Sequence, residues 1–253
     1  LFGARADRFE YQTNGRRQSG RVAALHLADG TRLDGDLFVS ALPFDRLGGV
    51  CDSSMCKADE RLRRLDRLST SPILGVHLWF ARPVMTHSHL ILVQSPLQWI
   101  FNKGIVSADN TPTPETGDAA REAGQHIHGV ISAAHQLVDL PAHEIIELVL
   151  QEVRKALPDA RRAEVIDARV IKEKRATFSV KPGVDRLRPL ASGAISNLYL
   201  AGDFCRSGWP ATMEGAVRSG YIAAAAALHE AGEEAEVLAP DLDRSGLYKF
   251  LVG

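Results

Sequence analysis

The segment between residues 197 and 227 limits the fold of this chain more than any other part of the sequence. It opens with a short apolar run, Leu198 to Ala201, passes through Gly202-Asp203 and an irregular loop, and ends in a long alanine-rich stretch. The pattern predicts a buried strand, a loop, and a helix that begins near Ala211 or Thr212. A strand that leads through Gly-Asp into a helix is typical of α/β proteins.

Several residues of this segment suit it to bind a ligand. Gly202 lets another group approach the backbone closely, and Asp203 supplies a carboxylate that accepts a hydrogen bond from a sugar-like hydroxyl. Pro210 precedes the helix, and the N–H groups of the first turn, around Thr212 and Glu214, favour an anion or an electron-rich carbonyl. A purely structural interpretation stays open, with Asp203 as a helix cap or turn residue.

The helix that follows carries a face of small residues. These are Gly215, Ala216, Ser219 and Gly220. A helix with such a face can lie very close to a flat ring or to another backbone. The structural alternative is close packing of the helix on a sheet.

The rest of the chain alternates between strand and helix patterns. Asp29-Gly30 lies between two apolar runs and predicts a hairpin. Residues 45–70 predict helix with a stop at Ser69 to Pro72, Ala142 to Leu157 predicts an amphipathic helix, and the Gly-, Pro- and Thr-rich residues 105–124 predict a mobile loop. Further strands are expected at Val22–Leu27, Leu37–Val39, Ile73–Phe80, Leu90–Val93, Trp99–Phe101, Ile127–Ser132 and Val165–Phe178.

Composition excludes several functional classes. The 253 residues carry a net charge of −1 and are 45% hydrophobic, which predicts a globular core and argues against nucleic-acid binding through phosphate contacts. No run approaches the ~18 apolar residues of a membrane-spanning helix. The three cysteines form no disulfide framework, and we expect a reducing, cytoplasmic compartment.

No metal site is expected from the sequence. Cys51 and Cys56 lack a second pair of ligands at zinc spacing. His87 with His89, and His126 with His128, alternate as residues on one face of a strand do, but no further ligand is identifiable near either pair. A solvated strand face is the expected role of these histidines.

The amino-acid sequence of the 197–227 segment resembles a flavin signature. It contains Tyr199 to Asp203, then Gly208 and Pro210, then Glu214-Gly215-Ala216, and finally Ser219-Gly220 with Ala223. This order is similar to the C-terminal signature of FAD-dependent amine oxidases and of carotenoid and squalene desaturases. The stretch Trp209 to Gly220 most resembles the squalene-associated FAD-dependent desaturases, also called hydroxysqualene dehydroxylases, and plant-type phytoene desaturases are similar but less close.

The resemblance implies how FAD would be held. Asp203 would bond to the ribityl chain, and backbone N–H groups of Met213 and Glu214 would face the flavin pyrimidine carbonyl. Trp209 and Pro210 would pack near the ring system. The full set of expected cofactor-binding residues is Gly202, Asp203, Trp209, Pro210, Ala211, Thr212, Met213, Glu214 and Ala216, with Ala41 and Pro43 at the end of a strand under the adenosine half. The resemblance identifies no catalytic residue.

The family's glycine-rich Gly-x-Gly-x-x-Gly turn, which holds the FAD pyrophosphate, is not present in the sequence. We therefore expect the chain to be the C-terminal part of a longer protein and to be inactive by itself. The fold class expected is α/β (α+β). Residues 1–47 and 190–232 would form part of a Rossmann-like FAD domain, 48–189 a substrate domain with a mostly antiparallel sheet and helices, and 233–253 a tail.

The main hypothesis is a reductase that converts hydroxysqualene to squalene with reduced FAD, in hopanoid biosynthesis. Two alternatives stay open, a desaturase of squalene or a phytoene-type carotenoid, and a non-catalytic fragment. The apolar strands at 73–80, 90–93 and 99–101 are candidates for the wall of an apolar tunnel. The expected partner is an apolar isoprenoid, and residues 247–252 suggest peripheral contact with the inner membrane. The oligomeric state is left open.

Overall fold

The computed structural model describes residues 2–13, 20–104, 124–233 and 236–240. The chain has a mixed α/β fold, which confirms the expected fold class, and divides into two compact units. Unit 1 combines Leu1–Ser69 with Val180–Gly253, and unit 2 is Thr70–Ser179. Each unit is described by itself.

Unit 1 contains two small sheets. Strands β1 (Ala6–Thr13), β2 (Gly20–Leu27) and β3 (Arg32–Asp34) form an antiparallel sheet in that order. The turn between β2 and β3 contains Gly30 at φ +88°, which confirms the predicted hairpin. Strands β4 (Phe38–Ser40) and β10 (Leu198–Leu200) form a parallel pair, although they lie far apart in the sequence.

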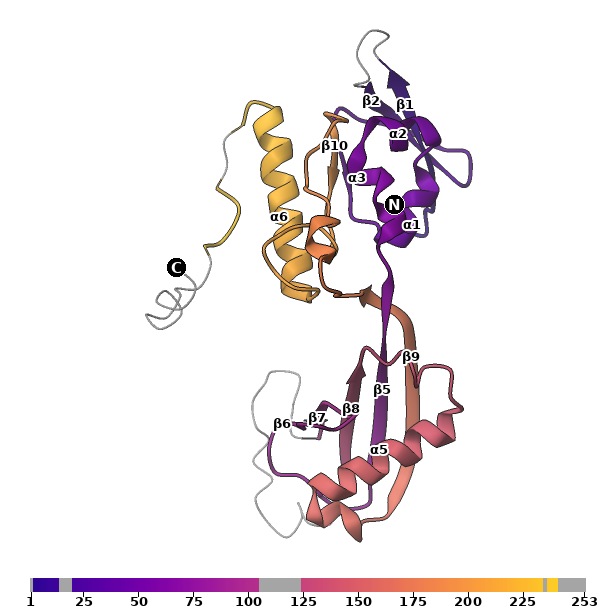
Figure 1. Cartoon of the computed structure of the whole chain (residues 1–253), viewed down its shortest axis with the longest axis vertical. Helices are drawn as coiled ribbons and strands as arrows, with labels where there is room; N and C mark the ends of the chain where they lie inside the picture. Colours follow the sequence, from indigo (N-terminus) through magenta and orange to yellow (C-terminus); the bar gives the residue numbers. More distant parts are fainter. Residues whose placement is uncertain (1, 14–19, 105–123, 234–235, 241–253) are drawn as a thin grey trace. The chain divides into compact units, whose positions relative to one another are not determined.

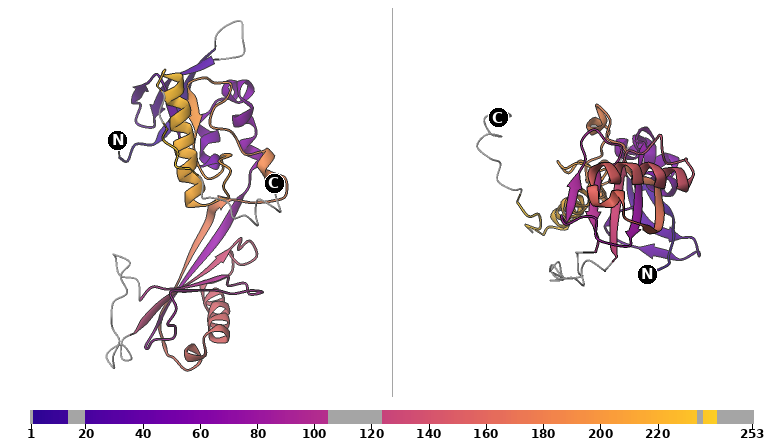
Figure 2. Two further views of the ribbon diagram at one scale, coloured as in Figure 1. Left: turned by 90° about the vertical axis from the view of Figure 1, so that its left-hand side faces the viewer. Right: turned by 90° about the horizontal axis from the view of Figure 1, so that it is seen from below.

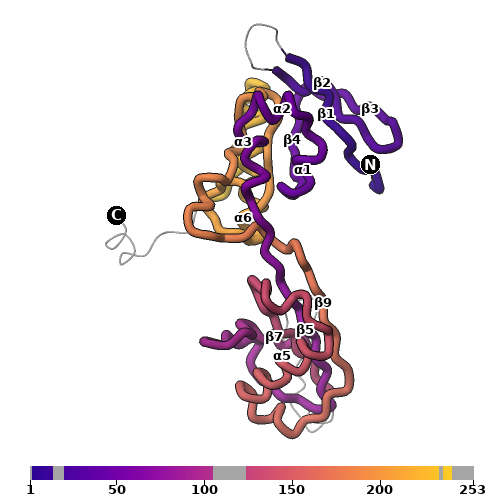
Figure 3. Tube along the Cα trace, turned by 45° about the vertical axis from the view of Figure 1, so that its right-hand side comes forward, coloured from indigo at the N-terminus to yellow at the C-terminus, as the bar shows by residue number. Residues whose placement is uncertain are grey.

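The residues predicted to be helical over 45–70 form short helices in unit 1. These are α1 (Phe44–Val50), α2 (Ser53–Ala58) and α3 (Glu60–Arg63), which follow one another along the chain (Figure 3). The Asp52 side chain accepts hydrogen bonds from the amides of Ser54 and Met55, and Asp59 accepts one from Arg61. Each aspartate starts a new helix, so the predicted helical region is confirmed but is divided into separate short helices. Single-turn 3₁₀ helices follow at Leu65–Arg67 (η1) and Val184–Arg186 (η3).

Unit 2 is a five-stranded antiparallel sheet covered on one face by a helix (Figures 1 and 2). The strand order is β6-β7-β8-β5-β9, and helix α5 (Ala142–Ala156) places Ile145, Val149 and Val153 on the sheet. This confirms the predicted amphipathic helix and the antiparallel sheet. The 3₁₀ helix η2 is Pro158–Arg161, and the strands are β5 Thr70–Phe80, β6 His89–Ile91, β7 Trp99–Asn102, β8 Gln125–Ser132 and β9 Val165–Phe178.

The helical region predicted over 45–70 ends at Arg67, before Ser69, which confirms the predicted stop, and β5 begins at Thr70, three residues before the predicted Ile73. Thr70 pairs with Phe178 and Ser71 with Thr177, and the register of the pairing shifts between Ser71 and Ile73. Pro72 lies at this irregularity, where its missing N–H interrupts no regular ladder bond. Two other predictions, the loop at 105–124 and the membrane-contacting tail at 247–252, lie outside the described residues except for Gly124.

Asn197 joins the two sheets of unit 1. Its side-chain oxygen accepts a hydrogen bond from the Val22 amide at 2.8 Å, and its side-chain nitrogen donates to the carbonyls of Val22 and Asp36 at 2.8 and 3.0 Å. Asn197 is buried and directly precedes β10. It therefore fixes where β10 lies against β2 and β4.

Replacing Asn197 with alanine should lower the free energy of unfolding by about 2–4 kcal/mol, because the buried amide and carbonyl of Val22 and the part-buried bond to the Asp36 carbonyl lose their partner together. Urea unfolding followed by circular dichroism measures this change. Ser196→Ala, at the exposed neighbouring position, is the matched control and should change stability by less than about 0.5 kcal/mol. Similar values for the two variants would show that the Asn197 bridge does not stabilise unit 1.

Candidate functional site

The predicted site residues lie at one edge of the parallel pair β4–β10. Ala41 directly follows β4 and Ala201 directly follows β10, and the Ala201 amide donates to the Ser40 carbonyl at 2.9 Å. Because parallel strands end at the same edge, the loop with Ala41 and Pro43 and the loop that starts at Gly202 leave the sheet side by side. The fold thus brings together two segments that are about 160 residues apart.

Gly202 has a backbone that another residue would strain. Its φ is +147°, and a Cβ at this position would overlap the ring of Phe204. The Gly202 amide donates to the Ser219 hydroxyl at 2.7 Å, and that hydroxyl donates to the Ala216 carbonyl at 2.6 Å. Ser219 therefore ties the end of β10 to the helix that follows.

That helix, α6 (Met213–Glu230), begins two residues later than Ala211. Thr212 is its N-cap, and the Thr212 hydroxyl accepts a hydrogen bond from the Gly215 amide at 3.0 Å. Ala211 thus lies in the loop, and Thr212 ends the loop rather than starting the helix. The amides of Met213 and Glu214 precede the first intrahelical donor, and both residues are exposed.

Small residues let α6 pack closely on β10 (Figure 1). Tyr199 of β10 and Ala201, which follows the strand, form a buried cluster with Ala223 and Ala227 of the helix. A Cβ at Gly215 would overlap the Pro210 carbonyl oxygen, so the first turn of α6 lies directly against the loop. The small-residue face thus serves helix–sheet and helix–loop packing at Gly215 and Ser219, whereas Ala216 and Gly220 are half-buried.

The loop between Gly202 and Thr212 is held by a buried arginine that the sequence did not single out. Arg188 Nη2 donates to the carbonyls of Asp203, Cys205 and Trp209 at 3.1, 2.6 and 2.8 Å. Its Nη1 bonds to the Asp185 carboxylate at 3.1 Å. One guanidinium thus binds three carbonyls of an irregular loop. These bonds fix the backbone at Asp203 and Trp209.

Trp209 packs beside the first turns of α6. The guanidinium carbon of Arg218 lies 5.5 Å from the centre of the indole ring, and Arg218 also pairs with Glu214 at 3.5 Å. Trp209 is half-buried and is therefore not a fully buried core residue. Its indole is therefore oriented by a cation–π contact and keeps a surface that a flat ring can contact.

A cavity of about 540 Å³ lies next to Ala41 and Pro43. Leu42, Arg46, Gly49 and Val50 line one side, and residues 4–7 line the other. Its lining combines small residues with two arginines, Arg5 and Arg46, and the acidic Asp7. A cavity with charged groups of both signs suits a polar ligand better than a purely apolar one.

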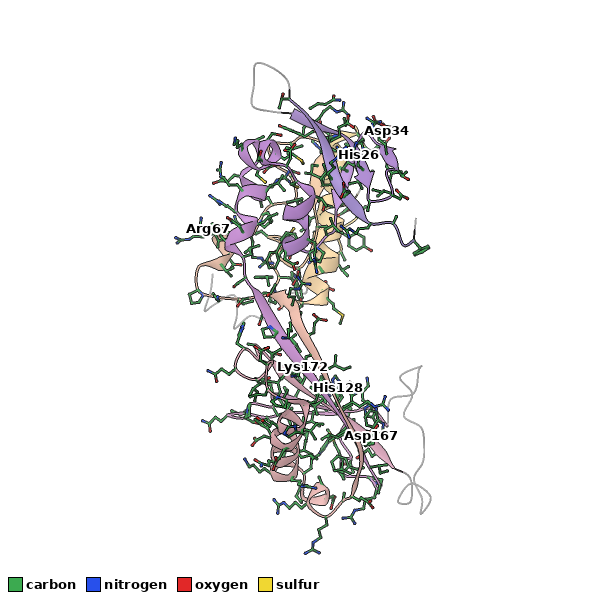
Figure 4. All side chains as sticks on the ribbon, turned by 90° about the vertical axis from the view of Figure 1, so that its right-hand side faces the viewer. His26, Asp34, Arg67, His128, Asp167 and Lys172 are labelled. Atoms are coloured by element: carbon green, nitrogen blue, oxygen red, sulfur yellow. The ribbon has the colours of Figure 1, made fainter. Side chains whose placement is uncertain are left out.

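The histidine cluster of unit 2 is a second candidate site. His77 of β5 pairs in register with His128 of β8, and their parallel rings stack at 4.2 Å between centres. His77 Nδ1 lies 3.0 Å from His126 Nε2, a hydrogen bond between two imidazoles. The sequence pattern predicted that His126 and His128 share a strand face, but it did not predict that His77 joins them. The alternation of His77 with Trp79, which places both on one face of β5, could have indicated this. Figure 4 labels His128 on the sheet.

The rings of this cluster are uncharged at neutral pH. Burial lowers the pKa of His128 to about 4, with further lowering from the charges of His77, Lys103 and His126. Burial is also the main cause that lowers the pKa of His77 and of His126. The charges of Lys103 and Arg169 lower the pKa of His77 further, and those of His77 and Lys103 lower the pKa of His126 further. No group of three or more metal-ligating side chains converges anywhere in the described residues.

A thiol nucleophile is not available in the loop of unit 1. Cys205 is buried, and burial raises the pKa of its thiol to about 12. The thiolate is therefore not populated near neutral pH.

None of the helices within the described ranges is long and apolar enough to cross a membrane.

The fold and the Gly-Asp loop define a class of protein. Residues 3–228 match the family described as flavin containing amine oxidoreductase, and the chain belongs to this family. The fold is also that of solved oxidoreductases: cyclohexylamine oxidase from Brevibacterium oxydans (TM-score 0.60, 16% identity, 90% of this chain and 48% of that one) and an oxidoreductase from Methanosarcina mazei (TM-score 0.59, 18% identity, 86% and 47%).

Within the family, the names of the curated relatives indicate that those proteins act on isoprenoids. The 15-cis-phytoene desaturase of Solanum lycopersicum is 28% identical over 84% of this chain and 36% of its own length. The hydroxysqualene dehydroxylase of Sinorhizobium fredii is 38% identical over 62% of this chain and 33% of its own length. The chain spans about a third of the length of the curated relatives that it matches.

The histidine cluster should make the fold acid-sensitive. The folded pKa of His128, about 4, lies below the ordinary value of about 6.5, so between these values the unfolded chain binds a proton that the folded chain does not. The free energy of unfolding should therefore fall as pH drops from about 6.5 to about 4. In His128→Phe this fall should be smaller, as urea unfolding at several pH values will measure.

His87→Phe is the control for this experiment, because His87 is exposed and lies outside the cluster. It should keep the acid-side slope of the wild type. Equal slopes in wild type and His128→Phe would contradict the burial of a neutral imidazole at position 128.

Proposed function

We propose that this chain is the C-terminal part of an FAD-dependent oxidoreductase that acts on a long, apolar polyisoprenoid. Membership of a flavin family supports the cofactor, and the names of the curated relatives support the substrate class. The observation that carries the proposal is the Gly202–Thr212 loop. It connects β10 with α6, and hydrogen bonds from Ser219 and Arg188 hold it.

The residues present fit a flavin. We assign Asp203 to the ribityl hydroxyls, and the amides of Met213 and Glu214 at the start of α6 to the electron-rich carbonyl edge of the ring. Gly202, Ala211, Thr212 and Ala216 allow the ring to approach the backbone, and Trp209 with Pro210 flanks it. Ala41 and Pro43, beside the 540 Å³ cavity, are assigned to the adenosine half. When bound, FAD supplies hydride transfer to or from carbon.

Two reactions fit this substrate class. Desaturation of a phytoene-type hydrocarbon has the wider support, since several phytoene desaturases match more than four fifths of the chain. This support favours the alternative over the reductase that the sequence first suggested. Reduction of hydroxysqualene remains the second candidate because the dehydroxylase has the higher identity over the segment that it covers.

Arg188 offers a test of the cofactor assignment that does not depend on the substrate. In the complete polypeptide that contains this chain, Arg188→Met should weaken FAD binding by roughly tenfold or more, because charge-assisted bonds to the loop carbonyls are lost. The FAD dissociation constant is measured from flavin fluorescence. Arg186→Met, whose side chain is exposed two residues away, should bind FAD as the wild type does; equal affinities of the two variants would contradict the assignment.

Product analysis on the complete polypeptide separates the two reactions. With oxidised enzyme, phytoene and a quinone acceptor, we expect products with longer conjugation and a red-shifted absorbance. With reduced enzyme under anaerobic conditions, the second candidate instead yields squalene from hydroxysqualene. A flavin-loaded enzyme that converts neither compound would refute the substrate class, and a protein without flavin would favour a non-catalytic fragment.

A further inference from the structure

A small cavity of unit 1 has arginines as its main lining. Its volume is about 200 Å³, and its walls come from residues around helix α3, from the segment before β10 and from the loop after β10. Four basic residues and one acidic residue are among those that line it: Arg61, Arg64, Arg188, Arg206 and Glu60. We call this space the arginine cavity.

Two of the four arginines are fixed by bonds within the fold. Arg61 and Arg188 are buried, with 8% and 6% of their surface exposed. Arg61 donates to the Leu198 carbonyl at 2.9 Å, and Arg188 holds the carbonyls of the Gly202–Thr212 loop. Because backbone groups fix both guanidinium groups, this part of the wall has its form before any ligand arrives.

The other two arginines keep hydrogen-bond donors for a ligand. Arg64 Nη1 donates to the Arg186 carbonyl at 3.2 Å, and Arg64 Nη2 donates to Glu60. Arg206 is exposed, and its Nη2 donates to the Asp185 carbonyl at 3.0 Å. A guanidinium carries more N–H donors than these bonds use. Both side chains can therefore bind a further acceptor without breaking the bonds that they already make.

The charges around the arginine cavity leave an excess on the positive side. Three of the arginines each have a carboxylate partner: Asp59 for Arg61 at 2.7 Å, Glu60 for Arg64, and Asp185 for Arg188 at 3.1 Å. Within the described part of the chain, Arg206 forms no ion pair. Since like charges in one cavity repel each other, a bound anion would offset the excess.

The size and the donor geometry define the ligand class. A volume of about 200 Å³ is below the roughly 300–1,000 Å³ of pockets that enclose a drug-sized ligand, so neither a flavin nor a long isoprenoid fits. Guanidinium groups match the oxygens of a phosphate in pairs of parallel hydrogen bonds. We propose that the arginine cavity binds a phosphate-type oxyanion, either a phosphate monoester or a diphosphate group. This inference goes beyond the proposed function and does not depend on it.

Two sources of such an oxyanion share this chemistry. Leu187 and Leu190 also line the arginine cavity, and 56% of the Leu190 surface is exposed. An apolar side chain beside the anion site suits a lipid headgroup, whose hydrocarbon part can pack on it. A free phosphate compound needs the arginines alone. The experiment therefore has one arm for each source.

The first arm titrates inorganic diphosphate into the complete polypeptide in a calorimeter, at an ionic strength held constant with chloride. The protein is first saturated with FAD, so that the cofactor site cannot take the diphosphate. Arg206→Met should raise the dissociation constant of diphosphate roughly tenfold or more, because charge-assisted bonds to the oxyanion are lost. Arg64→Met lies outside the Gly202–Thr212 loop and should give a similar loss, which separates the anion site from effects on that loop.

Arg67→Met is the matched control. Arg67 is an exposed residue of η1 that does not line the arginine cavity. Its replacement removes the same charge and should change the dissociation constant by less than about twofold, because exposed charges at a distance are screened.

The second arm measures co-sedimentation with phosphatidylcholine vesicles that contain or lack phosphatidate, whose headgroup is a phosphate monoester. Binding to phosphatidate that free diphosphate reverses and Arg206→Met abolishes identifies a lipid headgroup. Diphosphate binding without vesicle binding identifies a free oxyanion, and either result supports the site.

Two results would overturn the inference. One is a wild-type protein that binds neither diphosphate nor phosphatidate vesicles. The other is an equal loss of binding in Arg206→Met, Arg64→Met and Arg67→Met, which would indicate a general effect of surface charge. Neither result affects the assignments of FAD and of the polyisoprenoid, which rest on other residues.

Discussion

The structure of unit 1 depends on buried arginines that donate hydrogen bonds to backbone carbonyls. Arg188 holds the carbonyls of the Gly202–Thr212 loop, and Arg61, paired with Asp59 at 2.7 Å, donates to the Leu198 and Ala191 carbonyls next to β10. Irregular backbone cannot satisfy its own carbonyls, so without these guanidinium groups water would have to do so. The site is therefore rigid because its irregular parts are bonded to side chains, and a rigid loop holds its amides in place before any ligand arrives.

Sequence patterns predicted the elements whose signal is local. Helix α5 and strand β9 agree closely with their predicted bounds, because periodicity over 14 or 15 residues is hard to mistake. The helical prediction over 45–70 was right, but the breaks within it were not predicted. Asp52 and Asp59 cap new helices, and a cap competes with the continuing helix through one side-chain oxygen. A hydrophobic pattern does not record that competition.

The candidate site was predictable only in part. Gly202, Asp203 and the start of α6 lie in one short segment, so motif and local structure agreed. Arg188, Asn197 and the Ser219 bridge act through hydrogen bonds to residues 15 to 175 positions away, and nothing in their local sequence indicates these partners. His77 was missed for the same reason, since its partners are set by the register of β5 on β8, 49 residues on.

The flavin segment is compatible with both candidate reactions. The Gly202–Thr212 loop and α6 carry the flavin signature, and a flavin that donates hydride needs the same ribityl and carbonyl contacts as one that accepts it. Similarity in this segment therefore weighs equally for a desaturase and for a dehydroxylase. Discrimination between a hydrocarbon and an alcohol has to come from side chains that contact the oxygen, because a buried hydrogen-bonding group without a partner costs binding free energy.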